Sequence, residues 1–184
     1  QYKYGTTDVT RTICFSKPKP LVKNIFTKVL QGHISVANTN LNIDDVGKKI
    51  DIRARKFLKK ANLDYAHGTG HGVGFFLNVH EGPQSISKIN KIKIREGMII
   101  SNEPGYYKKN SFGIRIENLM FVKNKINNLY FENLTLAPIE KELINFKLLD
   151  SNEKDYLFRY HVNVYSKISR YLNLKERKWL ASFI

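Results

Sequence analysis

YAHGTGHGVGFFLNVHEGP, the stretch from Tyr65 to Pro83, decides how the rest of the chain is interpreted. It carries three of the five histidines in the 184-residue sequence, His67, His71 and His80, with glycines threaded between them. Glycine lets the backbone pass close to a ligand and adopt a positive φ angle without a Cβ clash. The stretch therefore predicts extended or looped backbone that holds imidazoles around a small ligand, and it is less suited to forming core.

Three other segments each place one carboxylate near the end of an expected strand: GTTDVTRT carries Asp8, SNEPGYY carries Glu103 and GIRIEN carries Glu117. An imidazole and several carboxylates that converge from separate strands are typical of a site for Mn²⁺, Co²⁺ or Zn²⁺. The spacing fits neither the HExxH zinc motif nor a phosphate-binding glycine loop. An aspartate at a turn can instead hydrogen-bond its own backbone, but the other candidate ligands favour Asp8 as a ligand. The residues alone thus indicate a metal centre built from dispersed ligands.

Four blocks in this order, QYKYGTTDVTRT, HGTGHGVGFFLNVHEGP, SNEPGYY and FGIRIEN, resemble segments of aminopeptidase P, the Xaa-Pro aminopeptidases of the methionine-aminopeptidase-like metallopeptidase family. The resemblance covers nearly the whole chain but only the second half of the family's protein. It implies an α+β fold of the pita-bread type (creatinase/methionine aminopeptidase-like), truncated at its N-terminal side. Residues 1–140 would form the C-terminal portion of the catalytic domain, and residues 141–184 a helical extension that follows it.

The resemblance also implies a dinuclear metal centre and a role for each ligand. Asp8 and Glu117 would bridge two divalent ions, expected to be Mn²⁺ with Co²⁺ or Zn²⁺ as alternatives, and His71 and Glu103 would bind the second ion. A hydroxide shared by the two ions would attack the peptide carbonyl, with Glu103 as general base. The implied reaction removes the N-terminal residue from peptides with proline in the second position, a specificity that comes from the resemblance alone.

Further residues are expected to support this reaction. His67 and His80 match family histidines that contact the substrate and stabilise the tetrahedral intermediate, although a histidine among glycines can also simply bond backbone carbonyls. Arg115 would hold Glu117 in place or form an ordinary cross-strand ion pair. Tyr107 is interpreted as a packing residue.

The sequence begins at Gln1, after the point where the family has an Asp-Ser-Gly stretch whose aspartate is a metal ligand. We therefore expect the first metal site to be weakened, and a separate N-terminal fragment is one possible way to complete the cleft. The alternative hypothesis is an inactive fragment, or a pita-bread module that binds protein or nucleic acid without catalysis.

Composition narrows the class of protein. The formal net charge is +15, yet the lysines are scattered rather than gathered with aromatic residues, so nucleic-acid binding is not favoured as the function. No apolar run reaches the length of about 18 residues that spans a membrane, and no apolar leader precedes the first expected strand. A single cysteine, Cys14, excludes an intrachain disulfide and fits a reducing compartment. We expect a cytoplasmic enzyme that acts on peptides, and the resemblance implies a homodimer in the full-length form.

Hydrophobic periodicity places the elements along the chain. Helices are expected over residues 21–38, 42–61, 151–172 and 174–184. Strands are expected in a hairpin over residues 1–15, and over residues 98–102, 112–122 and 129–139. Asn42 is expected to cap the second helix, and Cys14 to be a buried or half-buried strand residue.

Overall fold

The computed structural model describes residues 1–42, 44–74, 76, 78–126 and 128–184. Two positions of the histidine-rich stretch, Phe75 and Leu77, lie outside the described residues. The chain divides into two compact units. The first unit comprises residues 1–12 and 28–135, and the second unit comprises residues 13–27 and 136–184.

The first unit is built around a three-stranded antiparallel sheet. Its order is β3 (Ile99–Asn102), β6 (Asn118–Lys125) and β7 (Asn128–Asn133). In the β3–β6 register Asn102 pairs with Asn118. Glu103 follows the first member of this pair and Glu117 precedes the second, so the register brings the two carboxylates out at the same end of the sheet.

Two short strand pairs extend the first unit. Strands β4 (Gly105–Lys108) and β5 (Phe112–Arg115) form a hairpin, and β1 (Gly70–His71) pairs with β2 (Ser85–Ile86). The single strand predicted over residues 112–122 is therefore wrong, because the chain leaves the hairpin after β5 and enters the sheet at β6. Between the two strands, the backbone N–H of Glu117 donates to the carbonyl of Thr10 at 3.1 Å.

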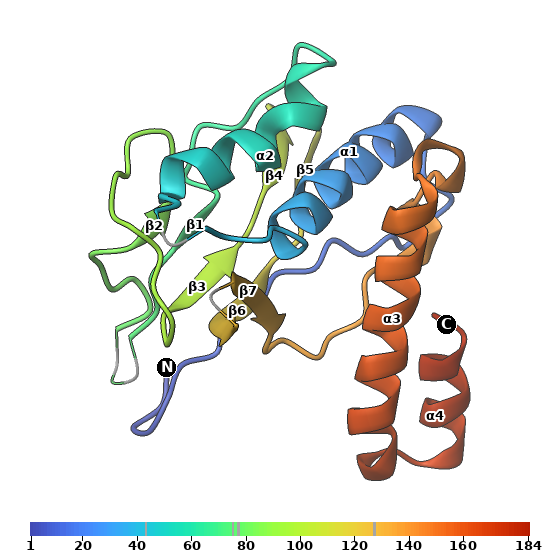
Figure 1. Ribbon diagram of the computed structural model, residues 1–184. Coiled ribbons are helices and arrows are strands. Elements are labelled where there is room, and N and C mark those ends of the chain that lie inside the picture. Colours follow the sequence, from blue (N-terminus) through green and yellow to red (C-terminus); the bar gives the residue numbers. More distant parts are fainter. Residues whose placement is uncertain (43, 75, 77, 127) are drawn as a thin grey trace. The chain divides into compact units, whose positions relative to one another are not determined.

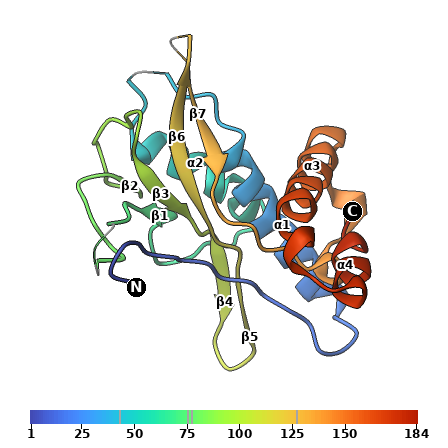
Figure 2. The ribbon, with the colours of Figure 1, turned by 90° about the horizontal axis from the view of Figure 1, so that it is seen from below.

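Helix α2 (Gly47–Lys59) and the part of α1 (Pro20–Ala37) that belongs to the first unit lie on one face of the sheet (Figures 1 and 2). The prediction for α1 is confirmed to within one residue at each end. The predicted N-cap at Asn42 is wrong, since α2 begins only after Val46. Val46 forms a bridge with Lys93, which keeps the backbone before α2 extended.

The N-terminal segment does not form the predicted hairpin with strands. A bridge joins Tyr2 to Gly5, and further along Thr10 is bridged to Glu117. Beyond the Tyr2–Gly5 bridge, the segment thus runs beside a distant part of the chain. Cys14, in the second unit, is half-buried as expected, but the structure assigns it to no strand.

The second unit is mainly helical. It contains α3 (Ser151–Ile168) and α4 (Leu174–Ala181), together with the 3₁₀ helices η1 (Lys141–Leu143), η2 (Phe146–Leu148) and η3 (Ser169–Tyr171). Asp150 caps α3 through a capping box with Glu153. The helix ends before the predicted residue 172, where the chain tightens into η3. Among the described helices, none has the length and apolar character needed to cross a membrane.

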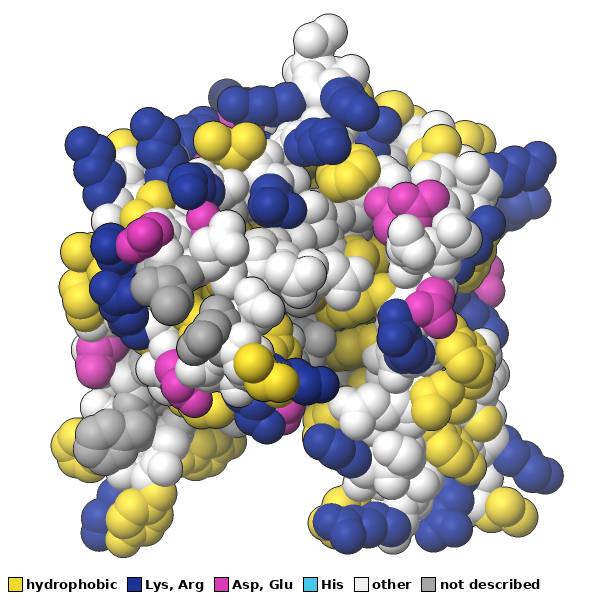
Figure 3. All heavy atoms as spheres, viewed as in Figure 1, with side chains coloured by type: hydrophobic (Ala, Val, Ile, Leu, Met, Phe, Trp, Pro, Cys, Tyr) yellow, Lys and Arg dark blue, Asp and Glu magenta, His cyan; other side chains and the backbone are white. Residues whose placement is uncertain are grey.

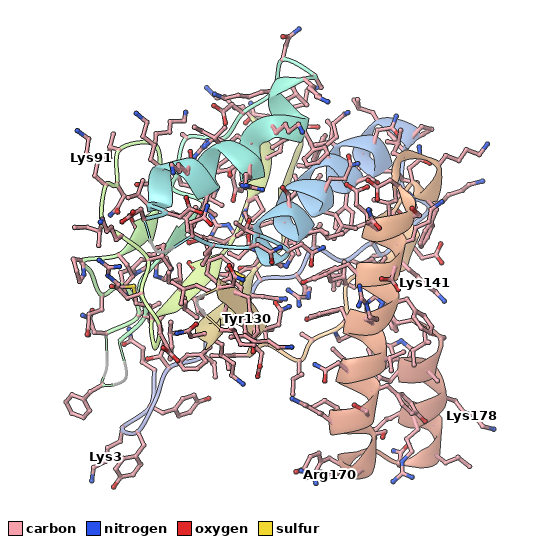
Figure 4. All side chains as sticks on the ribbon, in the orientation of Figure 1. Lys3, Lys91, Tyr130, Lys141, Arg170 and Lys178 are labelled. Carbon is pink, nitrogen blue, oxygen red and sulfur yellow. The ribbon has the colours of Figure 1, made fainter. Side chains whose placement is uncertain are left out.

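The excess positive charge lies on side chains that point outward. Figure 3 shows lysine and arginine side chains spread over the visible face, with uncharged side chains between them. Lys3 and Lys91 in the first unit, and Lys178 in the second, extend away from the ribbon (Figure 4). This distribution matches the scattered pattern of lysines in the sequence.

Candidate metal centre

Asp8, His71 and Glu117 come together from three separate segments of the first unit. One potential ligand atom from each lies within 4.8 Å of the other two. The Nε2 atom of His71 is 3.4 Å from Oδ2 of Asp8. His71 stands on β1, Asp8 on the N-terminal segment, and Glu117 between β5 and β6, so the fold assembles this group from residues far apart in the sequence.

Glu103 adds a further carboxylate to this group. Its Oε1 lies 3.3 Å from Nε2 of His71, and its side chain is mostly buried. Ser101 fixes both neighbours, because its Oγ accepts from the backbone N–H of His71 and donates to Oε1 of Glu103 at 3.2 Å. The four predicted ligands are thus next to one another, at the end of the sheet that the β3–β6 register indicates.

The glycines around His71 allow close packing of backbones. A Cβ on Gly70 would lie 1.9 Å from the carbonyl oxygen of Ser101, and one on Gly72 would lie 2.0 Å from that of Glu81. Among the described glycines, a positive φ occurs at Gly97, outside the histidine-rich stretch. The expectation that these glycines supply positive φ is therefore wrong, and the close approach they permit is between neighbouring backbone segments.

The hydrogen bonds of His71 determine which nitrogen is free to bind a ligand. Its Nδ1 lies 3.0 Å from the carbonyl oxygen of Gly72, which can only accept, so Nδ1 carries the proton of the neutral ring. Nε2, which carries no hydrogen in this tautomer of the neutral ring, faces Asp8 and Glu103. This tautomer is the one that a metal-binding imidazole needs.

Glu117 is held by the N-terminal segment as well as by the sheet. Thr10 Oγ1 donates to Oε2 of Glu117 at 2.5 Å, and Arg11 donates to the Glu117 carbonyl at 2.7 Å. A second amino group of Arg11 donates to Oδ1 of Asn118 at 2.7 Å. Asp8 is thereby anchored beside Glu117, because the residues that follow it are bonded on either side of the glutamate.

His67 and Arg115 are joined through Tyr107. Nδ1 of His67 donates to the carbonyl of Gly68 at 2.6 Å, so its Nε2 accepts from the Tyr107 hydroxyl at 3.0 Å. The same hydroxyl accepts from Nε of Arg115 at 2.7 Å, and an amino group of Arg115 lies 3.4 Å from Oε2 of Glu103. The ion pair of Arg115 is therefore with Glu103, where the sequence suggested Glu117.

Sequence reasoning missed Tyr107, which was interpreted as packing. The signal lies in the hairpin register: Tyr107 pairs with Gly113, and Gly105 pairs with Arg115. Residues diagonal to each other across a strand pair share a face and can interact. Tyr107 and Arg115 are such a diagonal pair, but the sequence did not indicate where the hairpin turns.

His80 and an open groove complete the surroundings of this group. His80 is exposed, and its ring lies 4.0 Å from that of His71, centroid to centroid, with the two planes tilted by 39°. A groove of about 370 Å³ runs beside Arg115. Its lining consists of Thr10, Arg11, Thr12, Tyr107, Gly113, Ile114 and Arg115.

Comparison with known proteins identifies the family. Residues 1–124 match the metallopeptidase family M24, and residues 127–182 match the C-terminal region of peptidase M24. The chain belongs to the M24 family. The pita-bread α+β fold expected from the sequence is the fold of this family.

The M24 relatives include proteins named for Xaa-Pro cleavage. Aminopeptidase P2 of Arabidopsis thaliana is 47% identical over 98% of this chain, and Xaa-Pro aminopeptidase 1 of Dictyostelium discoideum is 43% identical over all of it. The X-prolyl aminopeptidase of Caenorhabditis elegans, described as a cytosolic enzyme with a di-nuclear active site, superimposes on 97% of this chain with a TM-score of 0.92 and 38% identity. The chain spans 27 to 31% of the length of these three proteins.

The donor set of this M24 chain fits divalent cations. Burial raises the pKa of Glu103 to about 7, with the negative charge of Glu117 adding to the effect, and burial and Asp8 raise the pKa of Glu117. Arg115 opposes both shifts without cancelling them. Three carboxylates around one imidazole therefore carry more negative charge than nearby side chains neutralise, and bound cations would remove that excess.

Proposed function

We propose that this chain is the metal-binding part of an aminopeptidase that removes the N-terminal residue from peptides with proline in the second position. The observation that carries the proposal is the convergence of Asp8, His71, Glu103 and Glu117 at one end of the sheet. The M24 relatives named as Xaa-Pro or X-prolyl aminopeptidases support the substrate class. The proline requirement rests on these relatives and not on any contact described above.

The four ligands would hold two divalent metal ions, with Mn²⁺ proposed because carboxylate oxygens dominate the donor set. Asp8 and Glu117 would be shared between the ions, and His71 and Glu103 would bind the second one. Bound divalent ions lower the pKa of water and polarise a substrate carbonyl. The di-nuclear active site of the C. elegans protein supports two ions rather than one.

The other residues would move a proton and orient the substrate. Glu103 would act as general base, accepting a proton and passing it to the leaving amine. Arg115 would keep the Glu103 carboxylate in place through the contact at 3.4 Å. His67 and His80 would face the substrate carbonyl, and the Tyr107 hydroxyl would fix the ring of His67 through the bond at 3.0 Å.

Other properties of the full-length protein belong to the same proposal. We propose a cytoplasmic location, supported by the description of the C. elegans relative as cytosolic. The boundary between catalytic domain and extension at residue 140 stays a prediction. So does the homodimer, which light scattering of the full-length protein would test.

The test compares two tripeptides that differ only in the second residue, proline or alanine. After dialysis against a chelator and reloading with Mn²⁺, the purified protein should release the first residue from the proline peptide and leave the alanine peptide largely intact. Turnover should disappear with the chelator and return with Mn²⁺. Metal binding without hydrolysis of either peptide would instead favour the alternative, a non-catalytic M24 module.

Elemental mass spectrometry on the same Mn²⁺-loaded sample separates these two possibilities further. Two ions per chain would mean that both metal sites form, whereas fewer than two would fit the weakened first site that the sequence leads us to expect. His71→Ala should lower this number, whereas a substitution of the buried His161, in the second unit, should not. Unchanged stoichiometry in His71→Ala would contradict the proposed ligand set.

A further inference from the structure

Arg55 is a fully buried cation that takes no part in the metal centre. It lies on α2, with 2% of its surface exposed. Its Nε donates to Oδ2 of Asp51, one turn earlier on the same helix, at 2.7 Å. Burying a guanidinium costs free energy unless its N–H groups make hydrogen bonds. The other hydrogen-bond partners of Arg55 therefore indicate its role.

Those partners lie on the loop that carries His67. One amino group of Arg55 donates to Oδ1 of Asp64 at 2.6 Å and to the carbonyl of Tyr65 at 2.7 Å. The other donates to the carbonyl of His67 itself at 2.6 Å. The guanidinium also lies 3.8 Å from the centroid of the Tyr65 ring. A single side chain thus bonds Asp64, Tyr65 and His67 of the loop.

Asp51 extends this network to Thr69, whose backbone bonds Glu103. Its Oδ1 accepts from Oγ1 of Thr69 at 2.6 Å, and that hydroxyl also bonds the Tyr65 hydroxyl. The backbone carbonyl of Thr69 accepts from the N–H of Glu103 at 2.8 Å. Residues 65–69 are therefore held from α2 on one side and bonded to Glu103 on the other.

The ring of His67 has little freedom once its backbone is fixed in this way. It lies 4.8 Å from the Tyr65 ring and 5.4 Å from the Tyr107 ring, centroid to centroid. Its own ring nitrogens bond Gly68 and Tyr107. Moving the His67 carbonyl away from Arg55 would shift the ring against both tyrosines.

We propose that Arg55, oriented by Asp51, is a positioning residue that sets the place of the His67 imidazole beside the metal centre. Arginine is required because its planar fork supplies donors in several fixed directions, whereas a lysine ammonium is a single point that cannot span Asp51, Asp64 and the two carbonyls. The inference rests on the proposed function for the role of His67, but the placement of the ring can be measured without it.

The first experiment is a double-variant cycle on the Mn²⁺-loaded protein with the Xaa-Pro tripeptide. Arg55→Lys should lower kcat/KM by about a hundredfold, the loss that a misplacement of about 1 Å can cause. The same substitution in a His67→Ala background should cost little more, because the ring it positions is already gone. Equal losses in both backgrounds would overturn the proposal.

Two matched variants on α2 separate positioning from general stability. Ile50→Ala removes a buried apolar side chain from the same helix, and Lys49→Ala removes the exposed lysine that pairs with Asp45. Ile50→Ala should destabilise the fold, and neither variant should lower kcat/KM in a way that depends on His67. If Ile50→Ala shows the same dependence as Arg55→Lys, the role of Arg55 is only structural.

The second experiment needs no activity. With ¹³C-labelled histidine, the His67 ring resonance, assigned by its loss in His67→Ala, should shift or broaden in Arg55→Lys while that of His161 in the second unit stays in place. An unchanged His67 resonance would overturn the proposal. If the wild-type protein hydrolyses no peptide, the proposed function fails and this measurement alone decides the positioning role.

Thr69→Val keeps the inference testable should Arg55→Lys fail to fold. The substitution preserves the shape of the side chain and removes the hydroxyl that donates to Asp51. Thr69→Val should shift the His67 resonance in the same direction as Arg55→Lys does. The shift should be smaller, because the guanidinium of Arg55 remains bonded to the loop. No shift in Thr69→Val would contradict a network that runs from α2 through Asp51 to this loop.

Discussion

Two clusters of carboxylates in the first unit differ in what neutralises them. Asp51 and Asp64 surround the guanidinium of Arg55 and make hydrogen bonds to it of 2.7 and 2.6 Å. Partial burial acts to raise the pKa of Asp64, but hydrogen bonds from Arg55 and Lys88 outweigh it and lower the pKa to about 2. This cluster, the Arg55 cluster, is satisfied by the chain itself.

In the part of the chain that the structure describes, the second cluster, formed by Asp8, Glu103 and Glu117, has no such cation at its centre. The guanidinium of Arg115 lies 3.4 Å from Oε2 of Glu103 and also bonds Tyr107, while that of Arg11 bonds the backbone carbonyl of Glu117. Burial and neighbouring negative charge raise the pKa of Glu103 to about 7. The contrast teaches that carboxylates of one unit can have opposite roles: a lowered pKa accompanies the structural ion pairs of Asp64, and a raised pKa accompanies a buried group of carboxylates suited to cations.

The largest effect expected from this contrast concerns turnover. Glu103→Gln keeps the shape of the side chain but removes the charge and the proton acceptor, so hydrolysis of the Xaa-Pro tripeptide should fall by roughly 10³-fold or more. Circular dichroism should show an intact fold. Glu96→Gln, an exposed glutamate elsewhere in the first unit, is the matched control and should be fully active. Retained turnover in Glu103→Gln would mean that the second cluster is not the catalytic one.

Substitutions in the Arg55 cluster should lower the free energy of unfolding. Asp51→Ala leaves the guanidinium of Arg55 and the hydroxyl of Thr69 without their buried acceptor, and breaking a buried ion pair in this way costs about 3–5 kcal/mol. Urea unfolding of wild type and variant, both with metal removed, measures the difference. A loss of less than about 1 kcal/mol in the free energy of unfolding would show that this ion pair does not stabilise the fold as its geometry indicates.

The grouping of the four candidate ligands and the helix α1 could be predicted from the sequence because each depends on a local signal. The periodicity of Val29 and its neighbours marks α1, and histidine beside carboxylates on strand ends marks a metal centre whatever the exact register. Asp8, His71, Glu103 and Glu117 do lie together. Family resemblance, rather than spacing, supplied the pita-bread fold.

Contacts that depend on register or on helix rotation could not be predicted in the same way. Tyr107 meets Arg115 only because the hairpin turns where it does, and Thr10 meets Glu117 only because the N-terminal segment runs beside the sheet and makes no strand pair of its own. Arg55 looked like one of many scattered basic residues. Its burial follows from the way α2 packs, which the composition of the helix does not reveal.

A smaller effect, of the opposite sign, is expected for Glu103 in the metal-free protein. A carboxyl whose folded-state pKa is raised stabilises the fold fully below its ordinary pKa of 4.5, and this stability is lost as the pH rises to about 7. With a chelator at pH 8, Glu103→Gln should therefore be more stable than wild type by on the order of 2 kcal/mol. The difference should vanish near pH 4, and a destabilised variant at pH 8 would contradict the excess of negative charge.

The smallest effect is expected for the exposed ion pair at the edge of the Arg55 cluster. Lys88 donates to Oδ2 of Asp64 at 3.0 Å but is more than half exposed, so Lys88→Ala should cost no more than about 0.5 kcal/mol and less in high salt. Because the folded-state pKa of Asp64 is lowered, its pairing is fully present above pH 3.8 and is lost as the pH falls toward 2. The cost of Lys88→Ala should thus be the same at pH 7 and pH 5 and disappear near pH 2, as followed by urea unfolding. If Lys88→Ala instead cost as much as Asp51→Ala, the cluster would be held from its surface, and the buried guanidinium would not be what distinguishes it from the metal centre.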